Sequence, residues 1–109
     1  MPIVTGTGRF DSAEVGAHYA EQYRSADLSV GTYSLAVGAV DTQSPHTEDE
    51  IYVVVSGRAR FTDDAGTVEV GAGDTIFVAA GVPHRFSDIT QDLTLVVVFG
   101  PPEDSRKQG

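Results

Sequence analysis

The side chains best suited to chemistry gather in one short stretch of the sequence. His46, Glu48, Glu50 and Tyr52 stand at every second position there. Strand side chains alternate with period two, so an unbroken strand would place all four on one face. His84 lies in a second segment. If both segments face the inside of one barrel, two imidazoles and a carboxylate converge, a ligand set that holds iron(II) in non-haem enzymes and zinc in catalytic sites.

Each of these residues also has a simpler interpretation. His84 directly follows Pro83, and a histidine in a turn often does no more than make local hydrogen bonds. The acidic run at residues 48–50 is typical of a solvated loop. His18 has no comparable neighbours and is expected at the surface. Spacing alone therefore leaves both the metal site and the purely structural interpretation open.

Short strands must position these residues, because apolar and β-branched runs alternate with turns rich in Gly and Asp. We predict strands at Leu28–Val37, Ile51–Val55, Arg58–Thr62, Thr67–Val70, Thr75–Ala79, His84–Ser87 and Leu93–Phe99. Gly57 is expected to end the second of these, with the third as its hairpin partner. Residues 12–23 show no clean helical stripe and are predicted to form a loop or a short strand. This spacing of strands and turns favours an all-β sandwich or small barrel.

Composition excludes several classes of protein. The 109 residues are enough for one domain. Because the chain has no cysteine, it has no disulfide, no cysteine-based metal site and no thiol nucleophile. A formal net charge of −9 argues against nucleic acid or an anionic membrane as a partner. No apolar run is long enough to span a membrane, and the first residues lack the pattern of a signal peptide, so we expect a soluble, cytoplasmic protein.

Two spaced patterns make the interpretation more specific, and the first of them begins at Gly38. It continues through Ser44, His46, Glu50 and Gly57, and it matches the pattern G-x5-H-x-H-x3,4-E-x6-G. The one departure is Ser44, which stands where the first histidine is expected. This pattern is the first of the two motifs that mark the cupins.

The second pattern begins at Gly73 and runs through Ala79, Gly81, His84 and Asp88. It matches the second cupin motif, G-x5-P-x-G-x2-H-x3-N, with Ala79 and Asp88 at the proline and asparagine positions. The two patterns occur in the right order and together span about half of the chain. In this part the sequence resembles a small, single-domain bacterial cupin.

The resemblance implies an all-β fold, the cupin double-stranded β-helix or jelly-roll barrel, as a single domain. Residues 28–100 would form the barrel. Residues 1–27 would form an N-terminal segment of loops with a possible edge strand, and residues 101–109 a polar C-terminal tail, which we expect to be frayed. The flanking strands outside the two motifs suit the same barrel.

The resemblance also implies a divalent transition metal ion (Fe, Mn, Ni or Zn) held by His46, Glu50 and His84. Serine is a poor ligand for such an ion, so water can fill the position that Ser44 leaves. Alternatively, Gln43 or Glu48 supplies the fourth group. Tyr52 shares a face with Glu50 and is the candidate catalytic residue, as a hydrogen-bonding or acid–base group.

Small cupins include dioxygenases, isomerases, epimerases and lyases, so the resemblance implies a metal-dependent enzyme acting on a small molecule. The alternative is a non-catalytic cupin that binds or senses a small ligand and has a degenerate metal site. A homodimer is expected, formed through the strand Leu93–Phe99 or the N-terminal segment. Arg58 and Arg60 either meet an anionic substrate at the barrel mouth or lie on an exposed hairpin face.

Overall fold

The computed structural model describes residues 1–11 and 16–106 of the chain, and the regular structure in this part is antiparallel β-strand. The strands are β1 (Ala17–Arg24), β2 (Ser29–Leu35), β3 (Asp49–Asp63), β4 (Gly66–Gly71), β5 (Thr75–Val78) and β6 (Arg85–Gly100). The all-β prediction is confirmed. Within the same residues, no helix has the length and apolar character needed to cross a membrane.

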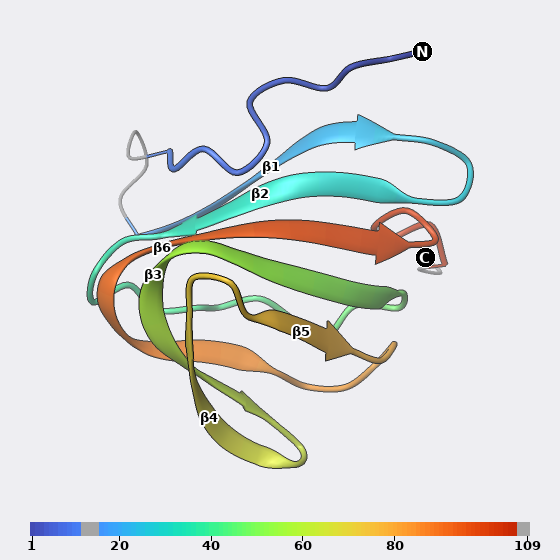
Figure 1. Cartoon of the computed structure of the whole chain (residues 1–109). Coiled ribbons are helices and arrows are strands. Elements are labelled where there is room, and N and C mark those ends of the chain that lie inside the picture. The colour runs from blue at the N-terminus through green and yellow to red at the C-terminus, as the bar shows by residue number, and fades with distance from the viewer. Residues whose placement is uncertain (12–15, 107–109) are drawn as a thin grey trace.

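The strands form one continuous sheet that folds back on itself. Its order is β1-β2-β6-β3-β4, and β5 pairs with the first half of β3. Figure 1 shows that β3 and β6 are long and strongly bent, so that their halves lie in two facing layers. The core fills the space between these layers, and the sheet curls into a barrel around it.

Two predicted strand boundaries are wrong. At each of them the structure has a bend within one long strand, and the strand does not end there. Gly57 does not end a strand. It lies within β3, at a φ of 97° and among register shifts in the pairing with β6. The predicted strand Arg58–Thr62 is therefore the second half of β3, paired with β4 rather than with Ile51–Val55. Likewise, the segments predicted at 84–87 and 93–99 belong to the single strand β6, apart from His84 just before it.

Part of the N-terminal segment, predicted as loops with a possible edge strand, lies within the described residues. The stretch 17–24 forms β1, an edge strand paired with β2, whereas residues 12–15 of the predicted loop or strand lie outside the described residues. The predicted dimer contact through the edge of Leu93–Phe99 is wrong, because β6 lies between β2 and β3 and is hydrogen-bonded on both sides.

Alternation along β3 decides what points into the barrel. Glu50, Tyr52 and Val54 are buried, while Ile51 and Val55 are exposed on the outer face. This is the period-two pattern of a strand that covers a core. The register therefore places a carboxylate and a phenol inside the barrel, among otherwise apolar side chains.

The start of the C-terminal tail is not frayed as predicted. Backbone amides at 103, 104 and 106 donate hydrogen bonds to the side chains of Ser29 and Glu48, which are 0% and 1% exposed. Residues 103–106 are thereby attached to the barrel. Residues 107–109 lie outside the described residues.

Candidate metal centre

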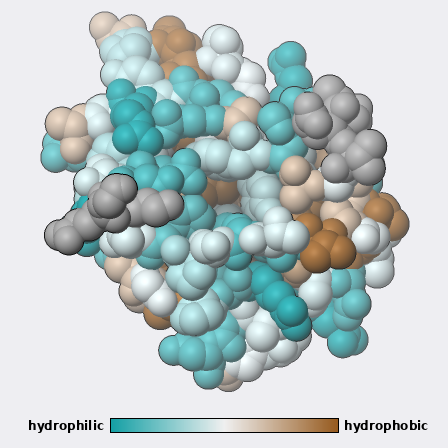
Figure 2. All heavy atoms as spheres, turned by 180° about the vertical axis from the view of Figure 1, so that it is seen from behind, coloured by the Kyte–Doolittle hydropathy of each residue, from teal (hydrophilic) through white to brown (hydrophobic). Residues whose placement is uncertain are grey.

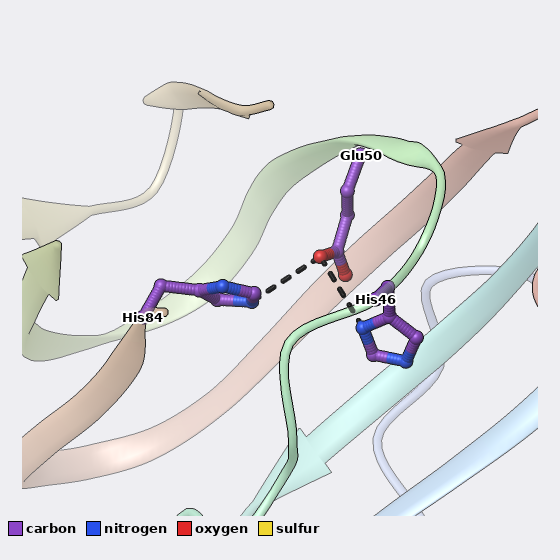
Figure 3. A group of neighbouring side chains, drawn as sticks. All are labelled: His46, Glu50 and His84. Carbon is purple, nitrogen blue, oxygen red and sulfur yellow. Dashed lines mark ion pairs between the residues drawn. The ribbon is translucent and has the colours of Figure 1, made fainter. Parts of the chain in front are cut away.

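Three side chains predicted as metal ligands meet inside the barrel. Figure 3 shows His46 on the loop before β3, Glu50 near the start of β3, and His84 just before β6. Glu50 Oε1 lies 3.2 Å from His84 Nε2 and 3.7 Å from His46 Nδ1. One ligand atom from each residue lies within 4.8 Å of the other two. The fold thus brings together residues that are up to 38 positions apart.

The facing atoms of this group are short of hydrogen-bond partners. His46 Nδ1 and Glu50 Oε1 are buried and have no hydrogen bond within the described part of the chain. Leaving a buried polar atom unpaired costs about 1–3 kcal/mol. A divalent cation would satisfy these atoms and the adjacent His84 Nε2 at once, and nitrogen and carboxylate oxygen are the donors that such ions prefer. The residues present fit a metal ion.

The outer nitrogen of each imidazole contacts an oxygen atom. His84 Nδ1 lies 2.9 Å from the carbonyl oxygen of Val82, and His46 Nε2 lies 3.1 Å from Glu103 Oε2. Since both oxygens act only as acceptors, each outer nitrogen carries the hydrogen. In the neutral rings the bare nitrogens then face Glu50, which is the arrangement that metal-binding histidines require.

The surrounding charges favour the protonated forms of both imidazoles when no cation is bound. For His46, the Glu103 carboxylate and then Glu50 outweigh burial and raise the pKa above its ordinary value. For His84, burial opposes the charge, but Glu50 and the Val82 carbonyl outweigh it, so the pKa is also raised. A cation and protons therefore compete for the same atoms.

Tyr52, the candidate catalytic residue, lies beside the group. Its hydroxyl is 2.9 Å from His84 Nε2 and 3.0 Å from Gln43 Oε1, so one hydrogen has two acceptors within reach. Burial, together with the charge of Glu50, raises the pKa of Tyr52 well above its ordinary value. The phenol keeps its proton at neutral pH and can donate it.

The structure separates the two residues considered as substitutes for the missing histidine. Gln43 lines the same cavity as His46 and contacts Tyr52. Glu48 instead accepts hydrogen bonds from Thr47 Oγ1 and from the backbone amides of residues 104 and 106, outside the metal-ligating group. Ser44 is exposed and does not line the cavity.

Asp41 helps to hold the loop of the candidate site in place, a role that was not predicted from the sequence. Its buried carboxylate accepts hydrogen bonds from Tyr33 Oη (2.6 Å), from the Phe86 amide (2.9 Å), and from both the amide (3.3 Å) and Nε2 (2.9 Å) of Gln43. These bonds fix the loop before β3 against β2 and β6 and turn Gln43 Oε1 toward Tyr52. An acidic residue on a loop between glycine and proline carries no sequence signal for such a role.

Glu103 was also missed, because it follows two prolines in a stretch that resembles a solvated tail. Its carboxylate contacts His46, and Glu103 lines the same cavity as His46. His18, by contrast, lies on β1 away from the group, 3.3 Å from Asp11. His18 is expected at the surface, and its side chain is partly exposed there.

The candidate centre opens into a cavity of about 230 Å³. Its lining combines tyrosines and apolar side chains with the polar residues described above (Ala17, Tyr19, Tyr33, Thr42, Gln43, His46, Glu50, Tyr52, Val97, Phe99 and Glu103). Tyr19 Oη is buried there and has no hydrogen-bond partner among the described residues. Figure 2 shows the mostly hydrophilic surface seen from behind, with a hollow near its middle.

A larger groove of about 710 Å³ lies on another part of the barrel and includes Arg58, Arg60 and Arg85. None of the metal-ligating group lines it. Both β3 arginines are exposed, and Arg60 lies 3.6 Å from Asp88. The smaller cavity is therefore the candidate site, because the converging titratable groups lie there rather than in the larger groove.

Comparison with known protein families identifies a domain that contains the metal-ligating group. The model of the cupin domain matches residues 31–99 of the chain, which contain all three members of the metal-ligating group. This chain belongs to the cupin family. An uncharacterized protein of Streptomyces coelicolor is 47% identical to this cupin over 85 residues, covering 78% of this chain and 81% of the relative.

Solved structures share the fold of this cupin at low sequence identity. KdgF from a Halomonas species superimposes with a TM-score of 0.75 at 21% identity, covering 89% of this chain and 91% of that one. The DMSP lyase DddQ from Ruegeria pomeroyi also gives 0.75, at 17% identity, over 100% of this chain and 57% of its own. The predicted jelly-roll barrel is confirmed. At these identities the likeness concerns the fold alone.

Proposed function

We propose that this cupin is a metal-dependent enzyme acting on a small molecule, with the ion held by His46, Glu50 and His84. The observation that carries the proposal is the convergence of one atom from each residue, two of them buried without a hydrogen bond. A bound divalent ion (Fe, Mn, Ni or Zn) supplies a Lewis acid, and with three protein ligands it keeps positions open.

The cavity supports a small, oxygen-bearing substrate. Its volume of about 230 Å³ is below the range of about 300–1,000 Å³ that is typical of sites for drug-sized ligands. Burial raises the pKa of Tyr19 above its ordinary value, so its unpartnered hydroxyl is a donor at neutral pH. A carboxylate, enolate or diol oxygen would satisfy this donor. Val97 and Phe99 add apolar surface to the lining, and the Phe99 ring packs edge-to-face with Tyr19.

Tyr52 is proposed as the acid–base residue of the site. Its protonated hydroxyl lies beside the metal-ligating group and can transfer a hydrogen to a substrate atom, while Gln43 holds the phenol in place from the other side. General acid–base catalysis by a positioned side chain contributes about 10²–10⁴-fold to a rate. The loss of turnover in Tyr52→Phe would have that size.

The metal content of the protein tests the ligand set. The chain is purified without chelator and assayed for transition metals, then stripped and reloaded with each of the four ions. We expect near-stoichiometric binding in the wild type and in His18→Ala, a matched control that removes a histidine outside the site. Binding should be lost in Glu50→Ala and in His84→Ala. If no ion binds under any loading condition, the enzyme proposal is wrong and a cupin that binds a small ligand without metal is the better explanation.

Oxygen dependence then separates the reaction classes. The loaded protein is offered diols, β-diketones and amino-acid derivatives while oxygen consumption is recorded. Consumption coupled to substrate loss supports a dioxygenase, whereas turnover that persists without oxygen supports an isomerase or a lyase. Because one solved structural neighbour is a DMSP lyase, the anaerobic assay is the more informative of the two.

We also propose that the chain forms a homodimer through the outer face of β3 and β5. Ile51, Val55 and Phe77 are 39%, 42% and 60% exposed on this face, and Ile51 is paired with Phe77 across the strands. Exposed apolar side chains that adjoin one another commonly mark a protein interface. A second copy related by a two-fold axis would cover the same face on both chains.

A further inference from the structure

The C-terminal segment Glu103–Arg106 is attached to the barrel at a specific place, next to the candidate metal centre. Glu48 Oε1 accepts a hydrogen bond from the Asp104 amide (2.7 Å), and Glu48 Oε2 accepts one from the Arg106 amide (3.0 Å). The Glu103 amide donates to Ser29 Oγ at 2.9 Å. Glu48 is only 1% exposed. A buried carboxylate is costly unless it is hydrogen-bonded, and here the segment supplies two of its donors.

This attachment brings the Glu103 side chain onto His46. Glu103 Oε2 lies 3.1 Å from His46 Nε2, and the two side chains are 22% and 15% exposed. Arg24 holds the same residue from outside, since its Nη2 donates to the Glu103 carbonyl oxygen at 2.8 Å. The Glu103 backbone is therefore held by Ser29 and Arg24, and its side chain contacts His46.

The contact with Glu103 decides which ring nitrogen of His46 carries the hydrogen in the neutral form. A carboxylate accepts but does not donate, so His46 Nε2 carries the hydrogen and Nδ1 is bare in the neutral ring. Nδ1 is the atom that faces Glu50 and lacks a hydrogen bond. His84 has the opposite tautomer, because Val82 accepts from its Nδ1 and leaves Nε2 facing Glu50. A backbone carbonyl fixes one ring, whereas the other depends on a side chain from a distant segment.

We infer that Glu103 is a positioning residue of the metal centre and that it holds His46 in the tautomer that presents Nδ1 to the ion. The hydrogen bonds from the C-terminal segment to Glu48 keep Glu103 in this place. The inference rests on the proposed function for its effect on metal binding. Its effect on the tautomer does not need a metal. Outer hydrogen-bond partners of metal-ligating histidines typically change metal affinity by about 10–100-fold.

Two measurements on the full chain test the inference. Long-range ¹H–¹⁵N NMR of the metal-free protein, at about pH 9 where imidazoles are neutral, reports which nitrogen of each ring is protonated. Calorimetric titration with Zn²⁺ reports affinity. Glu103→Ala removes the acceptor, whereas Glu103→Gln keeps an acceptor oxygen. Glu69→Ala, a change of an exposed glutamate on β4, is the control for the loss of one negative charge.

We expect the Nε2–H tautomer of His46 in the wild type, in Glu103→Gln and in Glu69→Ala, and a mixture of tautomers in Glu103→Ala. Zn²⁺ affinity should fall about 10–100-fold in Glu103→Ala and stay within a few-fold of the wild type in Glu103→Gln. His84 should keep its Nδ1–H tautomer throughout, which also verifies that each variant is folded.

The two proposals fail in different ways. If Glu103→Ala leaves the His46 tautomer unchanged, or if the wild type has the Nδ1–H form, Glu103 does not position the ring and the inference is wrong, even where Glu50→Ala abolishes metal binding. If the wild type binds no metal while Glu103→Ala changes the tautomer, the proposed function fails and the assignment of Glu103 to the ring holds. Equal loss of affinity in Glu103→Gln and Glu103→Ala, with unchanged tautomers, would mean that charge alone acts.

Discussion

Gly57 offers the sharpest test of how the barrel holds β3 against β6. It has a φ of 97°, a conformation that side-chain-bearing residues rarely adopt. A Cβ added there would lie 2.2 Å from the Asp92 carbonyl oxygen and 2.7 Å from Leu93 Cα, both backbone atoms of β6. Gly73 has nearly the same φ, 95°, but a Cβ there would meet nothing within 4 Å. A side chain at either position would therefore suffer the same backbone strain, but only one at Gly57 would also collide with β6.

The pair predicts a difference in unfolding free energy. Positive φ costs a residue with a side chain about 1–2 kcal/mol, so Gly73→Ala should lose about that much. Gly57→Ala should lose a further amount of about 1–3 kcal/mol, because β6 must move away from the added methyl group. Together this is about 2–5 kcal/mol, a large share of the stability of about 5–15 kcal/mol that is usual for a domain.

Urea unfolding, followed by far-ultraviolet circular dichroism, measures both losses on proteins prepared side by side. In thermal unfolding, each kcal/mol should lower the midpoint by roughly 4–8 °C for a chain of this size. Equal losses in Gly57→Ala and Gly73→Ala would refute the reasoning, since the collision with β6 would then contribute nothing. So would a loss below about 1 kcal/mol in Gly57→Ala.

Three further predictions concern the site and the outer face. Tyr52→Phe should lower the unfolding free energy by about 1–3 kcal/mol, because it leaves buried acceptors without their donor, and should keep metal affinity within a few-fold of the wild type by calorimetry. The raised pKa values of His46 and His84 mean that their carboxylate contacts stabilise the metal-free fold most below the unfolded pKa near about 6.5 and are lost as pH rises through the higher folded values. Thermal unfolding at pH 6 and 8 should therefore show a loss of stability with rising pH. The loss should be smaller in Glu50→Gln, which keeps the contact between His46 and Glu103, and Zn²⁺ affinity should rise over the same range; an affinity that stays flat would contradict histidine ligation. Light scattering should give the mass of two chains for the wild type and of one for Phe77→Lys, and a single-chain mass for both would contradict the proposed dimer.

Much of the fold follows from local sequence, because period-two alternation is a property of a single strand. The buried positions Glu50, Tyr52 and Val54 can be read directly from the sequence around them. Whether a glycine ends a strand or bends it depends on what lies opposite. Gly57 bends β3 because β6 passes against it, and no pattern within residues 50–63 contains that information.

The candidate site divides in the same way. His46, Glu50 and His84 were predicted because two spaced patterns resemble the cupin motifs, and the structure brings one atom of each residue within 4.8 Å of the others. Asp41 and Glu103 were not predicted, since each acts through a partner distant in sequence. The acidic run that contains Glu48 is visible in the sequence. Its hydrogen bond with the C-terminal segment is not, because the two segments meet only in the folded barrel.

The loop before β3 has a consequence for how sequences with this barrel can diverge. The loop is fixed at one end by the four hydrogen bonds to Asp41, and at the other by the His46 carbonyl oxygen, which accepts from the Gly81 amide at 2.7 Å. Between these points Thr42 and Ser44 are exposed, and Thr42 borders the cavity. Substitutions at these two positions leave both attachments in place. We therefore expect a library varied at Thr42, which borders the cavity, to change which small molecules are accepted while its members unfold at nearly the wild-type temperature, so that new specificities can arise on an unchanged barrel.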